Sequence, residues 1–184
     1  MEDGDNVVGL FSQGNPQSFL DPLTYLRAAH ARQAIIHRLL TQIAEGLPVP
    51  PLRATTDPVI SYLKQDLPLH FSDEEESLFP LLTERSLLAD PIDGWTGQLN
   101  HEHARDGAMA HEISHELERI VDRGAPANPS DFVALVTVFT ECQDRHLAWE
   151  NIVIIPHAEI RLGPRDLQKL GRDMAARRNV SISE

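Results

Sequence analysis

Two related segments, HFSDEEESLFP at 70–80 and HLAWENIVIIP at 146–156, decide how we expect this chain to fold. Each segment opens with a histidine, carries a glutamate four residues later and reaches a proline in its eleventh place. Residues four apart on an α-helix lie on the same face. Each segment can therefore direct one imidazole and one carboxylate at a single point. Together the two segments offer nitrogen and oxygen ligands suited to a pair of metal ions.

The composition restricts the classes of protein that the chain can belong to. It has 184 residues, 41% of them hydrophobic, and a formal net charge of −12. We expect one domain with tails, and neither nucleic acid nor an anionic membrane as a partner, since both favour basic surfaces. The single cysteine, Cys142, excludes an internal disulfide framework and any cysteine-rich metal site. No apolar run is long enough to span a membrane, and MEDGDNVVGL lacks the pattern of a signal peptide, so we expect a cytoplasmic protein.

Prolines and glycines divide the chain into helices. Asp-Pro pairs and the segment Pro129-Ser130-Asp131 supply capping side chains and prolines suited to a first helical turn. Strand signals are nearly absent. The expected helices cover about 21–46, 57–85, 91–123 and 130–155, and a shorter fifth helix follows Gly163-Pro164. Four long helices joined by short loops favour an all-α, up-down-up-down antiparallel four-helix bundle.

The same signals predict the domain boundaries and the effect of internal prolines. We expect a flexible N-terminal tail over 1–18, the bundle over 19–160, and a C-terminal helix and tail over 161–184. Pro68 and Pro80 should kink or interrupt the second helix, because proline lacks a backbone donor. Pro156 should end the fourth helix.

Helical periodicity places one histidine of each predicted helix on its apolar face, and two glutamates with them. Four imidazoles and two carboxylates without compensation would be costly in one core, and metal ions remove that cost. Imidazole and carboxylate ligands without thiolate suit iron, manganese or zinc. Six ligands exceed a single tetrahedral zinc and fit two octahedral ions bridged by the glutamates. The candidate metal ligands are His30, His70, Glu74, His103, His146 and Glu150.

On these residues, the chain resembles a haemerythrin-like (HHE) domain over roughly residues 20–157. The resemblance is carried by LRAAH ending at His30, the two eleven-residue segments, and the pair Glu102-His103. It implies a four-helix bundle that holds a non-haem di-iron centre with oxo or hydroxo and carboxylate bridges. It makes the four histidines terminal ligands, and Glu74 and Glu150 the bridges.

The resemblance has two departures. Oxygen-carrying haemerythrins have a second helix-three histidine four residues from the first and an aspartate on helix four. Here Leu99 and Gly107 stand four residues either side of His103. The six-ligand set is closer to the bacterial branch that includes di-iron proteins of iron–sulfur cluster repair, although their cysteine-bearing N-terminal domain does not occur in this sequence.

Several functions remain open at this stage. We expect a di-iron protein that binds dioxygen or nitric oxide for sensing, storage or stress response. The alternative is an enzyme or repair factor that turns over peroxide or nitric oxide, or that donates iron to damaged iron–sulfur clusters. A third possibility is a metal that only stabilises the fold, or an empty site in a domain whose helices serve an interaction role. The sequence also allows zinc or manganese in place of iron, and a monomer or a homodimer.

Other residues have simpler interpretations. The segment HEISH (111–115) matches a zinc-protease pattern, but its histidines point away from the predicted core, so we interpret it as a polar helix face. His37 lies about 10 Å along the helix from His30 and should be a supporting or core residue. Candidates for hydrogen bonds to the ligand imidazoles or to bound solvent are Asp66, Asp106 and Tyr62, with simple partial exposure as the equal alternative. The expected core or pocket-wall residues are Cys142 and Trp149, while Glu75 and Glu76 should face water.

Overall fold

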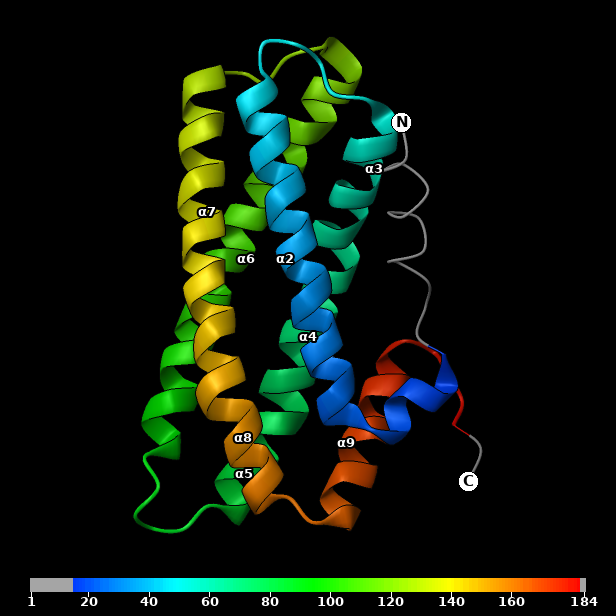
Figure 1. Cartoon of the computed structure of the whole chain (residues 1–184), viewed down its shortest axis with the longest axis vertical. Helices are drawn as coiled ribbons and strands as arrows, with labels where there is room; N and C mark the ends of the chain where they lie inside the picture. Colours follow the sequence, from blue (N-terminus) through cyan, green and yellow to red (C-terminus); the bar gives the residue numbers. More distant parts are fainter. Residues whose placement is uncertain (1–14, 183–184) are drawn as a thin grey trace. The chain divides into compact units, whose positions relative to one another are not determined.

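The structure, a computed structural model, describes residues 15–182 and consists of helices, turns and loops without a strand in this range (Figure 1). The prediction of an all-α fold is confirmed. The first long helix is α2 (Pro22–Gly46), and α6 (Ile92–Arg123) and α7 (Pro129–Trp149) follow later in the chain. The N-terminal tail expected over 1–18 lies mostly outside the described residues. Its last residues begin a 3-10 helix, η2 (Pro16–Leu20).

The chain forms two compact units. The described part of the first unit comprises 31–68 and 104–145, and that of the second comprises 15–30, 69–103 and 146–182. All six candidate ligands belong to the second unit. Its core is built from the apolar faces of several helices and includes Leu26, Leu78, Phe79, Leu99 and Ile154.

The region expected as one helix over 57–85 is a series of five helical segments. They are α3 (Arg53–Ser61), η3 (Tyr62–Asp66), α4 (Leu67–Asp73), η4 (Glu74–Leu78) and α5 (Phe79–Arg85). The prediction that it starts at Asp57 is wrong. Extended Leu52 precedes the first turn, and its carbonyl accepts the backbone N–H groups of Thr55 and Thr56, so the helix begins four residues earlier.

A π-helical turn comes before the proline of each of the two eleven-residue segments, 70–80 and 146–156. In η4 the Phe79 N–H bonds the Glu74 carbonyl, and in η5 (Glu150–Ile154) the Ile155 N–H bonds the Glu150 carbonyl. Such a five-residue step widens the helix where a proline ring would otherwise crowd the preceding turn. The predicted distortion before Pro80 is therefore confirmed. The same device precedes Pro68, where η3 closes with a Leu67-to-Tyr62 bond.

The prediction that Pro156 ends the fourth helix is wrong. Helix α8 (Ile155–Arg161) continues directly from η5, with the proline as its second residue. The helix ends only at Leu162, which adopts an extended conformation.

The last helix, α9 (Pro164–Arg177), packs against η2 inside the second unit. Leu170 and Met174 of α9 and Phe19 of η2 are buried in the same core. The two backbones approach closely at Gly171, where an added Cβ would lie 2.0 Å from the Phe19 carbonyl oxygen. Only glycine fits this position without a shift of backbone.

Replacing Gly171 by alanine should lower the free energy of unfolding by about 1–3 kcal/mol, because the methyl group overlaps a carbonyl that cannot rotate away. Gly97→Ala, at an exposed position of helix α6, is the matched control. Nothing lies within 4 Å of its added Cβ, so this change should leave stability equal or higher by up to about 1 kcal/mol. Urea unfolding of both variants checks the prediction. Equal effects of the two substitutions would contradict it.

Candidate metal centre

The six predicted ligands come together as two groups that share both glutamates. His30 and His70 form one group with Glu74 and Glu150, and His103 and His146 form the other with the same glutamates. Within each group the potential ligand atoms lie within 4.8 Å of one another. All six side chains are buried, none more than 4% exposed. Four different stretches of the chain therefore converge on one buried cluster.

Each glutamate turns its two oxygens toward different histidine groups. Glu74 Oε1 lies 3.6 Å from His70 Nε2 and 3.7 Å from His30 Nε2, while its Oε2 lies 3.4 Å from His103 Nε2. One oxygen of Glu74 therefore faces each histidine group.

Glu150 repeats this arrangement from the other eleven-residue segment. Its Oε1 lies 3.0 Å from His146 Nε2, and its Oε2 lies 3.4 Å from His30 Nε2. Within the second group, the Nε2 atoms of His103 and His146 are 3.1 Å apart. Four imidazole nitrogens thus face two carboxylates across a small volume.

Several of these buried polar atoms have no hydrogen-bond partner. They include both carboxylate oxygens of Glu74 and the Nε2 atoms of His30 and His70. Buried polar groups are normally satisfied, and leaving a charged one unsatisfied is especially costly. Cations between the histidines and the glutamates would satisfy these atoms. The donor set of imidazoles and carboxylates fits iron, and equally fits manganese or zinc.

Burial and neighbouring charges shift the pKa values of several candidate ligands in opposite directions. Burial, with the neighbouring Glu150, raises the pKa of Glu74 well above its usual value, and burial beside His30 lowers the pKa of His70 well below its own. Burial alone would raise the pKa of Glu150, but the adjacent imidazoles, His146 first, outweigh it and lower that pKa to about 2. Burial would likewise depress the pKa of His146, yet Glu150, Glu74 and Glu102 raise it to about 9.

A comparison with protein families decides what this cluster belongs to. Residues 21–166 match the family described as the Hemerythrin HHE cation binding domain. The chain belongs to the hemerythrin HHE family. The resemblance seen in the two eleven-residue segments is therefore confirmed. A comparison with curated proteins found no match.

The glutamates of this HHE domain occupy equivalent places in the backbone. Glu74 is the first residue of η4 and Glu150 the first residue of η5, so each carboxylate leaves the helix where a π turn begins. π turns inside helices often occur at functional sites. Here the proline six residues after each glutamate explains the turn, and the eleven-residue repeat of the sequence corresponds to a repeat of backbone geometry.

The outer nitrogens of three ligand histidines have partners that the sequence interpretation did not assign. His30 Nδ1 lies 2.9 Å from Asn151 Oδ1. His103 Nδ1 lies 2.8 Å from Glu75 Oε1, and His146 Nδ1 lies 3.0 Å from Glu102 Oε2. A metal-binding imidazole commonly donates its second N–H to such an oxygen, which fixes its orientation. Glu75 is exposed, as predicted, and its carboxylate in addition contacts His103.

Two residues proposed as imidazole partners have other roles. Tyr62 donates a hydrogen bond to Gln33 Oε1 at 2.9 Å, and Asp106 Oδ2 accepts one from Gln143 Nε2 at 2.6 Å. All four residues belong to the first unit. Asp66 is half-buried.

The remaining candidates lie outside the two ligand groups. His37, in the first unit, contacts Asp144 Oδ1 at 2.7 Å through Nδ1, and burial lowers its pKa. Cys142 is half-buried, and its Sγ lies 3.3 Å from Arg145 Nη2. Trp149 is 42% exposed and meets the Trp95 ring edge-on.

The HEISH segment forms a polar face, as predicted. His111 and His115 are exposed, with their Nε2 atoms 3.2 Å apart. They form no group of three with another histidine, cysteine, aspartate or glutamate in the part of the chain that the structure describes. The zinc-protease interpretation therefore has no third ligand.

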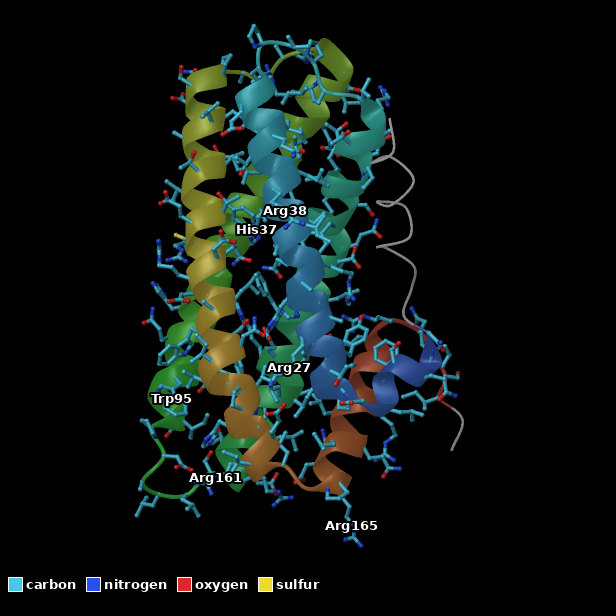
Figure 2. The ribbon with its side chains drawn as sticks, viewed as in Figure 1. Arg27, His37, Arg38, Trp95, Arg161 and Arg165 are labelled. Atoms are coloured by element: carbon cyan, nitrogen blue, oxygen red, sulfur yellow. The ribbon has the colours of Figure 1, made fainter. Side chains whose placement is uncertain are left out.

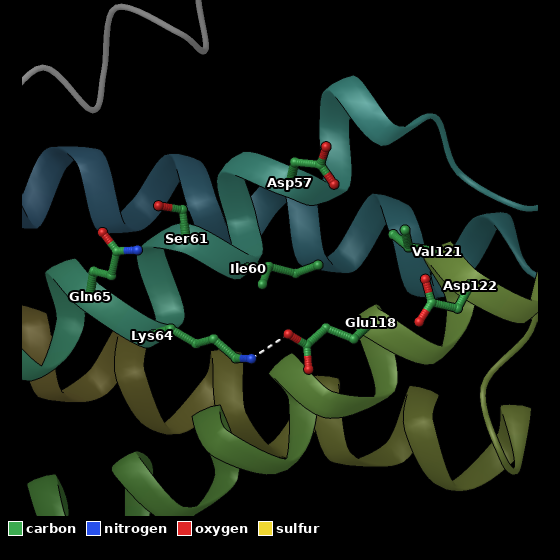
Figure 3. A pocket seen from close by; sticks show the side chains of 8 residues that line it. All are labelled: Asp57, Ile60, Ser61, Lys64, Gln65, Glu118, Val121 and Asp122. Carbon is green, nitrogen blue, oxygen red and sulfur yellow. Dashed lines mark hydrogen bonds and ion pairs between the residues drawn. The ribbon is translucent and has the colours of Figure 1, made fainter.

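A hollow of about 500 Å³ on the first unit is separate from this chemistry (Figure 3). Asp57, Lys64, Glu118 and Asp122 are among the residues that line it, and an ion pair joins Lys64 to Glu118 across it. None of the six ligands lines this hollow. Among the described residues, no helix is apolar enough over sufficient length to cross a membrane.

Metal binding to the metal-free HHE domain should strengthen as the pH rises toward about 9. His146, with its pKa raised to about 9, carries a proton at neutral pH that a cation must displace. Affinity therefore falls as the pH drops below that value and levels off above it. Manganese titrations between pH 6 and 9, in buffers of different protonation enthalpy, measure both the affinity and the protons released. Binding that is independent of pH and releases no proton would contradict the prediction.

Proposed function

We propose that this HHE-domain protein holds two iron ions in its second unit and uses them to bind a small ligand, dioxygen or nitric oxide. Such binding would serve sensing, storage or stress response. In both Glu74 and Glu150, one carboxylate oxygen faces the histidine group of His30 and the other oxygen faces the second histidine group. This observation carries the proposal. Zinc and manganese suit the same donors and are the alternative metals.

The residues of the chain have distinct parts in this proposal. A pair of iron ions, when bound, supplies redox chemistry and open positions for a small ligand. The four Nε2 atoms and the two carboxylates would hold the ions, while Asn151, Glu75 and Glu102 keep three of the imidazoles oriented. The burial of the ligands limits access of bulk water and favours entry of small, weakly hydrated molecules.

The family match also supports a proposal for the topology. We place α2, the α3–α5 series, α6 and the α7–α8 series as the four members of an up-down-up-down antiparallel bundle. Helix α9 is then an addition to that bundle. A monomer or homodimer in the cytoplasm, with a diatomic molecule or peroxide as its partner, completes the proposal.

Exposure of the anaerobically reduced, iron-loaded protein to dioxygen or nitric oxide tests ligand binding. We expect a new visible absorption band that persists and then disappears when argon removes the gas. His103→Ala, which removes one ligand, should weaken or abolish the band. Immediate and irreversible oxidation to a resting ferric state, with no reversible band for either gas, would contradict the binding function.

One observation favours a second function. Beyond the six ligands, no further histidine, cysteine, aspartate or glutamate of the described chain joins either group. A six-ligand set leaves open positions that suit turnover of peroxide or nitric oxide, or release of iron to damaged iron–sulfur clusters. Steady-state consumption assays and iron transfer to an apo iron–sulfur protein test this alternative, and the absence of all three activities in iron-loaded protein would end it.

A further inference from the structure

Asp73, the residue before the candidate ligand Glu74, has a fully buried carboxylate that contacts two arginines. Arg177 Nη1 lies 3.1 Å from Asp73 Oδ1, and Arg178 reaches both oxygens, with Nη1 at 3.1 Å from Oδ1 and Nη2 at 2.7 Å from Oδ2. A buried carboxylate needs such compensation, because an unpaired charge away from water is strongly unfavourable. The two arginines therefore hold the end of α4 in place.

Arg177 also holds the π turn that carries Glu74. Its Nη2 donates a hydrogen bond to Ser77 Oγ at 2.7 Å and lies 3.2 Å from Glu76 Oε2. One guanidinium thus links three residues, Asp73, Glu76 and Ser77, that lie on either side of Glu74 in the sequence. Its planar shape allows several directed bonds at once, which lysine cannot reproduce.

Both arginines stand at the end of a firmly docked helix. Arg178 follows α9 directly, donates to the Met174 carbonyl at 3.0 Å and lies over the rings of Phe19 and Tyr25. At the other end of α9, Arg85 makes a bidentate pair with Asp166, with contacts between 2.9 and 3.2 Å. Contacts therefore hold α9 at both ends, and its last residues are in fixed positions beside the turn that they contact.

This arrangement reaches beyond the family match. The match ends at residue 166, whereas α9 runs from Pro164 to Arg177. Arg177 and Arg178 thus lie beyond the matched residues, whereas Asp73, Glu76 and Ser77 lie within them.

We propose that Arg177 and Arg178 are positioning residues of the metal centre. Through Asp73, Glu76 and Ser77 they fix the turn from which Glu74 reaches the metals, so these two arginines set how firmly both ions are retained. The inference rests on the proposed metal-binding function. Its physical basis is that a ligand shared by two ions needs a fixed backbone, and small displacements of the supporting contacts weaken metal affinity.

The double variant Arg177→Gln, Arg178→Gln tests the proposal with two readouts. Release of ferrous iron to a chromogenic chelator, under anaerobic conditions, should become about 10–100-fold faster. Backbone amide exchange over 73–79 in the metal-free protein should also become faster, because the turn loses its anchors. Arg178→Lys keeps the positive charge and should accelerate iron release less than Arg178→Gln does. A variant with both Asp73→Asn and Arg178→Gln should release iron little faster than the faster of the two single variants, because both changes break the same contact.

Two controls separate positioning from general loosening of α9. Arg172→Gln removes one positive charge from an exposed position of the helix and should change neither readout. Arg85→Gln breaks the pair with Asp166 and should lower stability while iron release stays near the wild-type rate. Arg165, which projects from the first turn of α9 in Figure 2, offers a second exposed control.

The outcomes distinguish the inference from the function it rests on. Unchanged iron release in the double variant overturns the inference, whether or not amide exchange changes. Equal acceleration by Arg85→Gln also overturns it, because the effect would then reflect docking of α9 alone. A wild-type protein that binds no iron overturns the proposed function, and with it the metal-retention role. That failure is recognised before any arginine is replaced.

Discussion

Glu74→Gln is expected to lower the affinity for both metal ions together, by at least about 100-fold. Loss of a residue that merely supports a ligand costs about 10–100-fold, and Glu74 is a potential ligand in both groups. The amide keeps the shape of the carboxylate and removes its charge. Binding of ferrous iron or manganese, measured by competition with a chelator, gives the affinity of each site.

The same substitution should raise the melting temperature of the metal-free protein. The pKa of Glu74 is raised well above its usual value, so at neutral pH the folded state bears a cost that the unfolded chain does not. That cost grows as the pH rises from the unfolded pKa toward the folded pKa, and glutamine removes it. Each kcal/mol recovered corresponds to about 2–4 °C. Glu141→Gln, at an exposed position of α7, is the control and should change neither quantity. A Glu74→Gln protein with normal metal content would contradict the bridging role.

His70→Ala and His103→Ala should each remove one metal ion and spare the other. His70 belongs only to the group with His30, and His103 only to the group with His146. Each variant should therefore retain one ion per chain, and the double variant should retain none. Elemental analysis of the iron-loaded and desalted proteins measures this directly.

His101→Ala provides a close control for the histidine variants. His101 lies two residues before His103 on α6 but is exposed, so its removal should leave both ions bound. Loss of both ions from either single variant would indicate one coupled site in place of two separable ones. Retention of both ions would show that the replaced histidine is not a ligand.

The ligands could be predicted from the sequence because they obey a local rule. The spacing of four between His70 and Glu74, and between His146 and Glu150, is a property of any α-helix. The structure groups these residues with His30 and His103 at the positions that helical periodicity selected. Local periodicity was sufficient because each helix contributes its ligands from the same face that it buries.

The helix boundaries could be predicted less well because proline has more than one effect. Pro156 resembles a stop signal, yet the π turn of η5 accommodates it and the helix continues to Arg161. Whether the chain widens or stops before a proline depends on the packing that follows. Buried Ile155 and Ala158 supply that packing here.

Long-range partners were beyond prediction from the sequence. The Asp73 carboxylate meets Arg177 across 104 residues of chain, and His30 meets Asn151 across 121. Neither pair follows from helical spacing. One signal was present, since Glu75, Glu102 and Asn151 each stand next to a ligand in the sequence, where a turn of helix can bring the side chain to a neighbouring imidazole.

Stoichiometric titration of metal-free protein with ferrous iron, under anaerobic conditions, tests the central claim most directly. Two groups that share Glu74 and Glu150 predict a break at two iron ions per chain, and elemental analysis of the product should agree. A break at one ion per chain, or no saturable binding, would contradict a two-metal centre.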